Sequence, residues 1–241
     1  MGNHAKHSTA DLASGDHLCI LYETEEERNS ALAEYFRCGL DRNEKILYVT
    51  DHHDGRRISS CLNESGLDIE GALIKGQIKI IDIGTTKCPD EILELMRSEA
   101  KGPLEEDCSV LRIAVEMISS DCIKAAEYEA KIADFIRRIG CLTLCLYNQP
   151  RFDPSTIMDV LRAHPLVMVG AEVCKNLYYI PPGDQGRDSD SAMVLHAKES
   201  LLEHRHAEVR AQESEKKLRE IIERSIDAVV MTDRQGRITY V

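Results

Sequence analysis

The stretch Gly15–Phe36, GDHLCILYETEEERNSALAEYF, sets the expectation for the fold because one short turn joins an apolar run to a helix-forming segment. The apolar run His17–Tyr22 predicts a buried strand, and Glu25–Leu40 predicts a helix. In a nucleotide-binding P-loop, the turn between them reads GxxxxGK[ST], and its backbone N–H groups and lysine hold the phosphates. Here the turn, Glu23–Glu27, has no glycine, no lysine and four carboxylates, which would repel a triphosphate. The sequence therefore predicts the strand–turn–helix unit of such a protein without the residues that bind the phosphates.

Strand and helix patterns alternate along the next 140 or so residues, as expected for right-handed βαβ units. This alternation predicts an α/β fold with a mainly parallel sheet covered by helices on both faces. Ligands of such sheets bind at the carboxyl ends of the strands. Further strands are predicted within 44–53, 76–83, 108–117, 141–150, 166–170 and 176–180, and helices within 55–66, 88–100, 122–140 and 153–165.

The composition and net charge of the chain limit the kinds of function that it can have. The chain has 241 residues, of which 43% are hydrophobic and 30% charged, as is usual for a globular protein with a core. Its formal net charge of −12 argues against nucleic acid and anionic membrane surfaces as partners. No stretch approaches the roughly 20 apolar residues that cross a bilayer, and no basic-then-apolar leader opens the chain. We therefore expect a cytoplasmic protein, with residues 1–13 as a disordered tail.

Nine cysteines are present, mostly inside apolar patterns, without any CxxC or CxxCH spacing. This pattern is typical of reduced, buried thiols rather than of a zinc ribbon, a thioredoxin-type site or haem attachment. A metal or haem site built from Cys19, Cys145 and a histidine has no support from spacing. We therefore predict no metal and no other cofactor.

The polar, turn-rich segment 183–191 predicts a linker after a domain spanning residues 14–182. Residues 192–224 predict a long signalling helix, whose heptad seam is interrupted by charged residues and a histidine. A weak dimeric coiled coil and a solvated single helix both fit this pattern, so a homodimer through the helix stays open. Seam positions are Val194, Ala197, Leu201, Ala211, Leu218 and Ile222.

The last stretch, LREIIERSIDAVVMTDRQGRITYV, resembles the start of a PAS domain, with a short helix, a strand, a hairpin turn and a second strand. A PAS domain needs about 100 residues. We therefore expect residues 225–241 to be a truncated PAS start, with the remaining PAS and output domains downstream in a longer chain.

From about Asp16 to Pro182 the chain resembles the MEDS family, the methanogen and methylotroph sensory domains. The resemblance is carried in order by GDHLCILYETEEE, by LRIAVEM (111–117), by EYEAKI (127–132) and by the long block 144–182. It implies a RecA- or KaiC-like α/β fold whose P-loop is lost. It also implies a place in sensor histidine kinases and transcription regulators, with small hydrocarbon-derived compounds as ligands.

A RecA-like sheet would bring the ends of the first, fourth and fifth strands to a common crevice. Tyr22 and Glu23, Glu116, and Tyr147 stand at these ends, so we predict them as ligand-binding residues. Glu116 stands where an acid of a nucleotide site would lie, and we expect it to pair with Arg112 or to bind the ligand. A buried acid satisfied by Arg112 or by the backbone fits equally well.

Three further candidates come from the family's motifs and from the strand pattern. His17 and His164 match positions that recur in those motifs, and Cys145 lies in the fifth strand. Each has a structural alternative. His17 could fix the edge of the first strand, His164 could cap a helix before Pro165, and Cys145 could be a core residue.

These observations predict a non-catalytic sensory input module of a two-component signal-transduction protein, with a histidine kinase as the expected output. A small ligand would act through the helix on a PAS domain. The chain holds no phosphoacceptor helix and no ATP-binding domain, so we expect no kinase activity from it. Two alternatives stay open: a divergent nucleotide-binding switch or enzyme, and a thiol or metal redox sensor.

Overall fold

The computed structural model describes most of the first part of the chain and short runs of residues beyond it. The chain divides into two units, residues 1–193 and 194–241, and each is described by itself. The described residues are 8–50, 55–83, 89–105, 110–117 and 125–181, helical runs of one to three positions between 194 and 220, and 231–232 and 238–240.

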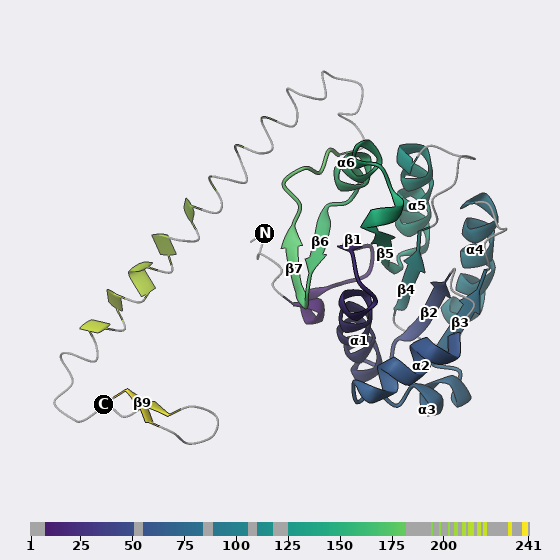
Figure 1. Ribbon diagram of the computed structural model, residues 1–241, viewed down its shortest axis with the longest axis horizontal. Coiled ribbons are helices and arrows are strands. Elements are labelled where there is room, and N and C mark those ends of the chain that lie inside the picture. Colours follow the sequence, from purple (N-terminus) through teal and green to yellow (C-terminus); the bar gives the residue numbers. More distant parts are fainter. Residues whose placement is uncertain are drawn as a thin grey trace. The chain divides into compact units, whose positions relative to one another are not determined.

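A seven-stranded sheet forms the centre of the first unit, in the order β3-β2-β4-β5-β1-β6-β7 (Figure 1). Every neighbouring pair from β3 to β6 is parallel, and only β7 runs antiparallel, beside β6. The predicted mainly parallel α/β fold is confirmed. The strands are β1 His17–Tyr22, β2 Lys45–Thr50, β3 Ile78–Asp82, β4 Leu111–Glu116, β5 Leu142–Asn148, β6 Leu166–Val169 and β7 Glu172–Lys175.

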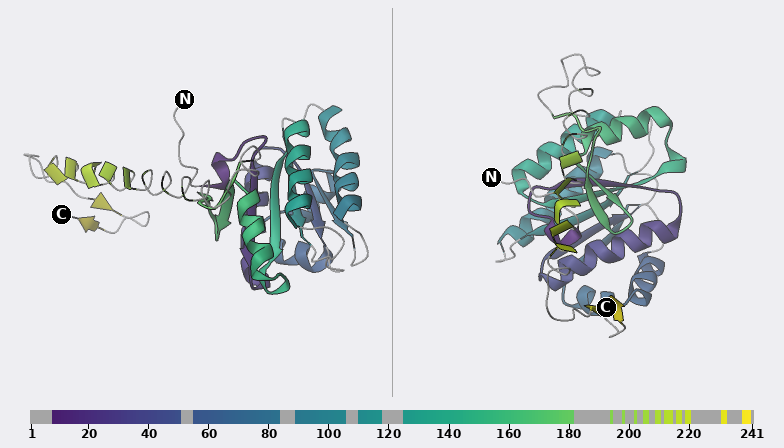
Figure 2. Two further views of the ribbon diagram at one scale, coloured as in Figure 1. Left: turned by 90° about the horizontal axis from the view of Figure 1, so that it is seen from above. Right: turned by 90° about the vertical axis from the view of Figure 1, so that its left-hand side faces the viewer.

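Helices cover both faces of this sheet (Figure 2). One buried apolar cluster joins α1, α2 and α3 to one face, and a second joins α4, α5 and α6 to the other. We call these the α1 face and the α5/α6 face. The helices are α1 Glu25–Asp41, α2 Gly55–Glu64, α3 Ile69–Ile74, α4 Pro89–Glu105, α5 Ala125–Ile139 and α6 Pro154–Ala163, with short 3-10 turns η1 Thr9–Asp11 and η2 Gln149–Arg151.

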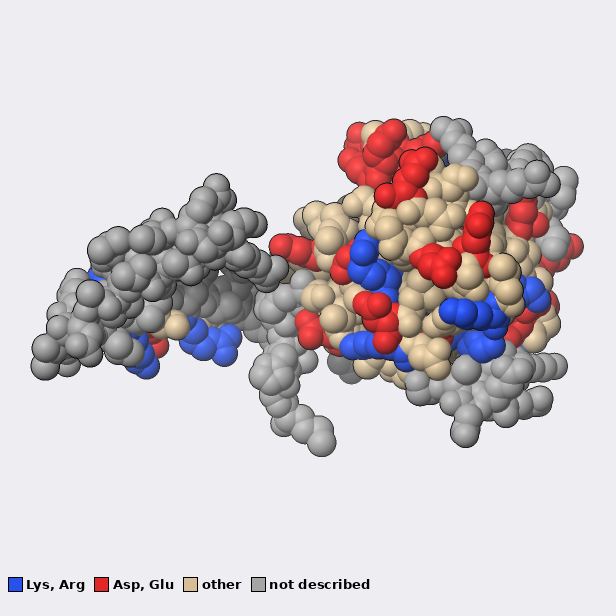
Figure 3. Space-filling model, turned by 90° about the horizontal axis from the view of Figure 1, so that it is seen from below, with Lys and Arg blue, Asp and Glu red and all other residues tan. Residues whose placement is uncertain are grey.

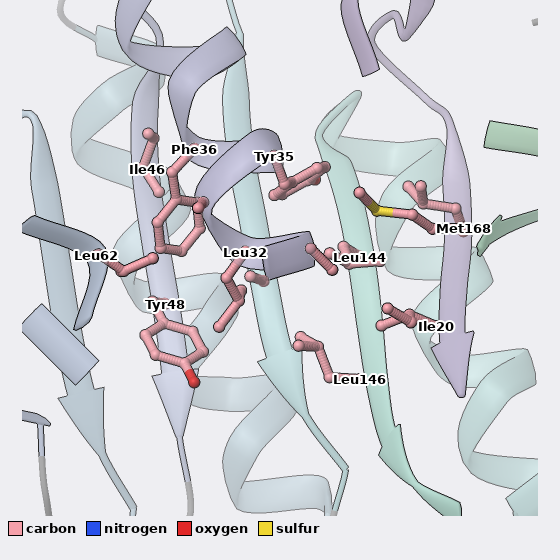
Figure 4. Close-up of a cluster of buried hydrophobic side chains, with 14 of the residues drawn as sticks. Ile20, Leu32, Tyr35, Phe36, Ile46, Tyr48, Leu62, Leu144, Leu146 and Met168 are labelled. Atoms are coloured by element: carbon pink, nitrogen blue, oxygen red, sulfur yellow. The ribbon is translucent and has the colours of Figure 1, made fainter. Parts of the chain in front are cut away.

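Helix α1 is the largest contributor to its face of the core. Leu32, Tyr35 and Phe36 are fully buried and pack on strand side chains such as Ile20 and Leu144 (Figure 4). The Tyr35 hydroxyl lies 3.1 Å from a β4 carbonyl oxygen and 3.2 Å from the Leu142 carbonyl oxygen. A buried aromatic hydroxyl therefore has acceptors, and the helix is fixed on the sheet.

Three local predictions differ from the structure. The second closing strand is β7, not residues 176–180, because Gly170 adopts a φ of 59° and turns the chain back at once, pairing Val169 with Glu172. Helix α3 was not predicted, and it begins where the Asp68 carboxylate accepts the Gly71 N–H at 2.9 Å. The predicted disordered tail overlaps η1, whose neighbour Leu12 is buried.

The second unit has helical backbone at its described positions between 194 and 220, and all of these positions are exposed. Strands β8 Met231–Thr232 and β9 Ile238–Tyr240 pair antiparallel. Of the predicted seam, only Val194 lies within the described residues. Throughout the described part of the chain, no helix is both long and apolar enough to cross a membrane.

Candidate ligand cavity and buried polar cluster

The sheet separates the predicted site residues into two groups on opposite faces. Side chains alternate along a strand, so Tyr22 points into the core of the α1 face while Cys145 and Tyr147 point into that of the α5/α6 face. Arg112 and Glu116 contact groups on the α1 face, and His17 contacts Cys145. The residues therefore do not form one crevice, because a packed sheet lies between the two groups.

Glu116 is a buried acid with partners on the α1 face. Arg28 of α1 pairs with it at 3.3 Å, the Tyr48 hydroxyl donates to it at 2.5 Å, and the Thr50 hydroxyl donates at 3.0 Å. Burial and the Glu116 carboxylate raise the pKa of Tyr48, which keeps its hydroxyl a donor. The structural alternative for Glu116 is thus the one observed, although the cation is Arg28, which was not predicted.

Arg112 does not pair with Glu116, and this part of the prediction is wrong. Four residues along one strand span about 13 Å, too far for the two side chains to meet. Arg112 instead donates to Glu44 at 2.5 Å and to the Tyr35 carbonyl at 3.2 Å. Its guanidinium lies 4.6 Å from the centre of the Tyr35 ring. The Arg112–Glu44 pair is a buried structural ion pair.

A P-loop would hold phosphates at the amino terminus of α1. Here the backbone N–H groups at this position donate to side chains of the same turn. The Thr24 hydroxyl accepts the Glu27 N–H at 3.2 Å, and Glu27 accepts the N–H groups of Glu23 at 2.8 Å and Thr24 at 3.4 Å. This capping box satisfies the amides that would otherwise attract an anion. Glu23 itself is exposed and contributes its backbone to the cap.

Four buried side chains converge on the α5/α6 face. They come from β1, α5, β5 and the carboxyl end of α6. His17 Nε2 lies 3.4 Å from Cys145 Sγ and 3.6 Å from Glu129 Oε2, and His164 Nε2 lies 3.3 Å from the same Glu129 oxygen. The centres of the two imidazole rings are 4.1 Å apart, and the rings are tilted by 46° to one another. We call His17, Glu129, Cys145 and His164 the buried polar cluster.

Outer partners fix the orientation of two members of this cluster. His164 Nδ1 donates to the Val160 carbonyl at 2.8 Å as α6 ends, so the predicted capping role of His164 is observed as well. The Tyr147 hydroxyl donates to Glu129 Oε1. Glu129 Oε2 and His164 Nε2 are left buried without a hydrogen-bond partner. Two acceptors therefore face each other in a dry environment, which is costly unless a proton or cation lies between them.

Burial sets the protonation of the cluster. It raises the pKa of Glu129 to about 8 and lowers that of His164 to about 4. Burial, with the charge of His164 as a second cause, also lowers the pKa of His17. Burial raises the pKa of the Cys145 thiol. At neutral pH and without a bound ion, the cluster is therefore uncharged, with the proton on Glu129.

A cavity of about 410 Å³ borders the cluster between α5, α6 and the start of β1. His17 and Glu129 belong to its wall, so the cluster is reached from the cavity. The cavity lies near the amino-terminal ends of β1 and β6, not at the carboxyl ends of the strands, where the sequence predicted the ligand. Its wall consists of Gly15, His17, Glu129, Ala130, Ala133, Ile136, Arg137, Asp159, Arg162, Ala163, Pro165, Tyr179 and Ile180.

Glu129 was missed as a site residue, although the sequence carries a signal for it. It stands three residues before Ile132 and seven before Ile136, both fully buried, so it lies on the apolar side of α5. An acid at such a position is exceptional, since carboxylates are rarely buried without a partner. The neighbouring Ala130 is exposed and borders the cavity.

On the surface of the first unit, acidic and basic side chains are interspersed on the face shown in Figure 3. Exposed ion pairs of the first unit include Lys79 with Glu99 at 2.7 Å and Lys131 with Asp90 at 2.8 Å. Such pairs contribute little to stability.

Comparison with known proteins supplies a family for the first unit. Residues 16–165 match the model of the family described as MEDS, the methanogen/methylotroph, DcmR sensory domain, which confirms the resemblance found in the sequence. No curated protein matches the chain.

The fold has solved counterparts at low sequence identity. One is the crystal structure of the KaiC-like protein PH0186 from the hyperthermophilic archaeon Pyrococcus horikoshii OT3, with 15% identity over 64% of this chain and 70% of that one, and a TM-score of 0.49. Another is the flagellar accessory protein FlaH from Methanocaldococcus jannaschii, with 14% identity over 67% of this chain and 76% of that one, and a TM-score of 0.47.

Proposed function

The chain belongs to the MEDS family of sensory domains, and on that premise we propose that its first unit binds a small ligand in the cavity between α5 and α6. The cavity is the observation that carries this proposal. Its volume of about 410 Å³ falls within the range of about 300–1,000 Å³ that is usual for small-molecule sites. Belonging to a family of sensory domains supports a non-catalytic role for this unit.

The cavity wall favours a small and largely apolar ligand with one polar end. Alanine, isoleucine and proline side chains supply much of the wall, as would suit a hydrocarbon-derived compound. Arg162 and Asp159 pair at 3.2 Å, but Arg162 Nε is buried without a hydrogen-bond partner. A buried unsatisfied donor is costly. An oxygen of a ligand, as in an alcohol, carbonyl or carboxylate, would satisfy it.

The segment after β7 links the cavity to the rest of the chain. Tyr179 and Ile180 form part of the wall, and residue 182 follows two positions later. Ile180 donates its N–H to the Arg162 carbonyl at 2.9 Å, and Asn176 Nδ2 donates to the carbonyls of Leu161 at 2.5 Å and His164 at 2.7 Å. A ligand that displaced Tyr179 or Ile180 would act directly on the chain leading to the second unit.

Signal output would then be a shift between two arrangements of the helical segment 192–224. The ligand needs only to bind one arrangement more tightly than the other. We propose that this helix leads to a PAS domain and to an output such as a histidine kinase. Exposed apolar side chains at Val194, Leu202 and Val209 support pairing of the helix in a homodimer.

A divergent nucleotide switch is the weaker candidate. The capping box at the start of α1 uses the amides that a phosphate would need, and Arg28 of the first helical turns is paired with Glu116. Neither group is free for a nucleotide.

Native mass spectrometry of the purified chain, compared with its denatured mass, tests the proposal first. We expect a small retained adduct, or a rise in melting temperature with one of a panel of short alcohols, amines, thiols, carboxylates and halocarbons. Ala133→Phe fills the cavity and should abolish both signals. Ala171→Phe makes the same change at an exposed turn outside the cavity and should leave them intact.

Two results would contradict the proposal. One is a retained nucleotide mass, which would favour the switch. The other is a ligand that binds Ala133→Phe as tightly as the wild type, which would place the site elsewhere.

A further inference from the structure

We propose that His17, Glu129, Cys145 and His164 bind a single divalent transition-metal ion, of the class to which Zn²⁺ belongs. The inference rests on the geometry of the buried polar cluster and is independent of the ligand proposed for the cavity.

The donor atoms have the spacing of a tetrahedral site. Around an ion with ligands at about 2.1 Å, tetrahedral geometry places the ligand atoms about 3.4 Å apart. Three separations in the cluster are 3.3, 3.4 and 3.6 Å, and one potential ligand atom from each of the four residues lies within 4.8 Å of the others. Small side-chain movements would complete the tetrahedron.

The outer hydrogen bonds are those that metal ligands use. A histidine bound to metal through one ring nitrogen usually donates its other N–H to a carbonyl or carboxylate. His164 does this through Nδ1 to the Val160 carbonyl, which leaves Nε2 with a free lone pair. Tyr147 likewise holds one oxygen of Glu129 and leaves the other, Oε2, without a donor.

Both orphaned acceptors therefore face the centre of the cluster. Glu129 Oε2 and His164 Nε2 are 3.3 Å apart and buried. Compared with this, the acid on the α1 face, Glu116, receives two hydroxyl groups and a guanidinium. A cation supplies for Glu129 and His164 what Arg28 supplies for Glu116.

The donor set selects the kind of metal. Two imidazole nitrogens, one thiolate and one carboxylate suit Zn²⁺ and its neighbours, whereas Mg²⁺ and Ca²⁺ prefer oxygen ligands alone. Because His17 and Glu129 also border the cavity, an ion can enter from that side. Cys19 is the register neighbour of Cys145 on β1 and is equally buried, but it is not part of the cluster.

Cobalt substitution of the full chain tests the site. The protein, purified with a reductant and stripped with a chelator, is titrated with Co²⁺, whose tetrahedral complexes show strong visible bands and a thiolate charge-transfer band. We expect saturation at one ion per chain with both features. Zn²⁺ should displace the cobalt and should raise the melting temperature of the wild type.

Substitutions of single residues identify which side chains bind the metal ion. Cys145→Ser should remove the charge-transfer band, and His164→Ala should lower the affinity at least tenfold, in line with loss of one ligand. Cys19→Ser, a matched change one strand away, should bind Co²⁺ like the wild type. Since the wild-type spectrum itself reports the thiolate and the geometry, the test does not depend on folding of the ligand variants.

Three outcomes would overturn the inference. Folded wild type that binds neither Co²⁺ nor Zn²⁺ shows that a proton alone satisfies the cluster. Loss of the band in Cys19→Ser but not in Cys145→Ser places the ion elsewhere. Binding that disappears only with Cys174→Ser, at an exposed thiol, shows adventitious capture at the surface. None of these outcomes bears on whether Ala133→Phe blocks the cavity.

Discussion

The two faces of the sheet bury similar polar residues and treat them differently. On the α1 face, Glu116 and Glu44 each have an arginine within 3.3 Å or less, and hydroxyl groups complete the shell of Glu116. Nη2 of Arg112 has no hydrogen-bond partner, but the charge of the guanidinium is matched by Glu44. On the α5/α6 face, Glu129 has no basic partner that is charged at neutral pH.

This difference separates a structural network from a candidate site. A buried network whose charges are matched adds rigidity and leaves little for a ligand to contribute. A cluster whose free acceptors face one another and a neighbouring cavity is stabilised by whatever cation or donor it binds. The α1 face also contains the start of α1, whose first N–H groups are satisfied by its own capping box. We therefore propose that the buried polar groups of the α1 face stabilise the fold and that those of the α5/α6 face bind a ligand.

The largest effect is expected from Arg112→Met on the α1 face. It removes the buried cation that lies nearest to Glu44, a residue only 3% exposed, and leaves that carboxylate with the half-exposed Arg42 at 3.8 Å. It also removes the contact with the Tyr35 ring. Breaking one side of a buried ion pair costs about 3–5 kcal/mol. Urea unfolding should show this loss, while Co²⁺ binding at the cluster should remain unchanged for the folded fraction.

The pair can be distinguished from simple loss of packing. The double variant Arg112→Met with Glu44→Gln removes the stranded charge and should recover part of the lost stability. If the double variant is no more stable than Arg112→Met, the ion pair is not the source of the lost stability. The buried charges of the α1 face would then not be stabilised by their pairing, and the proposed difference between the two faces would be wrong.

A smaller, pH-dependent effect is expected from Glu129→Gln in the presence of a chelator. The pKa of Glu129 is raised from 4.5 to about 8, so the folded state keeps a proton that the unfolded state has lost. The contribution of Glu129 to the free energy of unfolding therefore falls as the pH rises from 4.5 to 8. Between pH 6.5 and 8 this fall amounts to about 2 kcal/mol, and the titration of His17 and His164 is common to the wild type and Glu129→Gln.

Glutamine accepts the Tyr147 hydroxyl as the carboxyl does, but it cannot ionise. Denaturation curves from pH 6.5 to 8 should thus show a decline for the wild type that Glu129→Gln lacks. Parallel declines in the two proteins would mean that Glu129 is ionised at neutral pH. Glu129 would then be charged at neutral pH like Glu116, whose charge is matched, and the proposed difference between the two acids would be wrong.

Much of the fold was predictable because its signals are local. The apolar runs and the turns between them placed β1, β2 and β5 within a residue or two, and their alternation with helices predicted the parallel sheet. The closing hairpin was misplaced because its position depends on one glycine turn, and the segment 176–180 has the composition of a strand. Asn176 instead binds the end of α6.

The site was less predictable because it depends on which face each side chain takes. Of the residues predicted for the site, the structure brings His17, Cys145, Tyr147 and His164 together on the α5/α6 face. Tyr22, Arg112 and Glu116 lie on the other side of the sheet. A one-residue change in position along a strand reverses the face of the side chain, so a position at the end of a strand does not by itself predict which residues meet. Glu129 contacts β5 from a helix, and no spacing in the sequence relates it to Cys145.

The smallest effects should come from the helix caps, and these should be equal on the two faces. Thr24 caps α1, and Asp153 caps α6 by accepting the Thr156 N–H at 3.0 Å. Replacing either with alanine should cost about 1 kcal/mol in urea unfolding. Equal costs would show that the helices of both faces are built alike, so that the difference between the faces lies in the buried polar cluster. A much larger cost for Asp153→Ala, removed by adding Zn²⁺, would instead show that α6 as a whole depends on an occupied cluster, since His164 ends that helix.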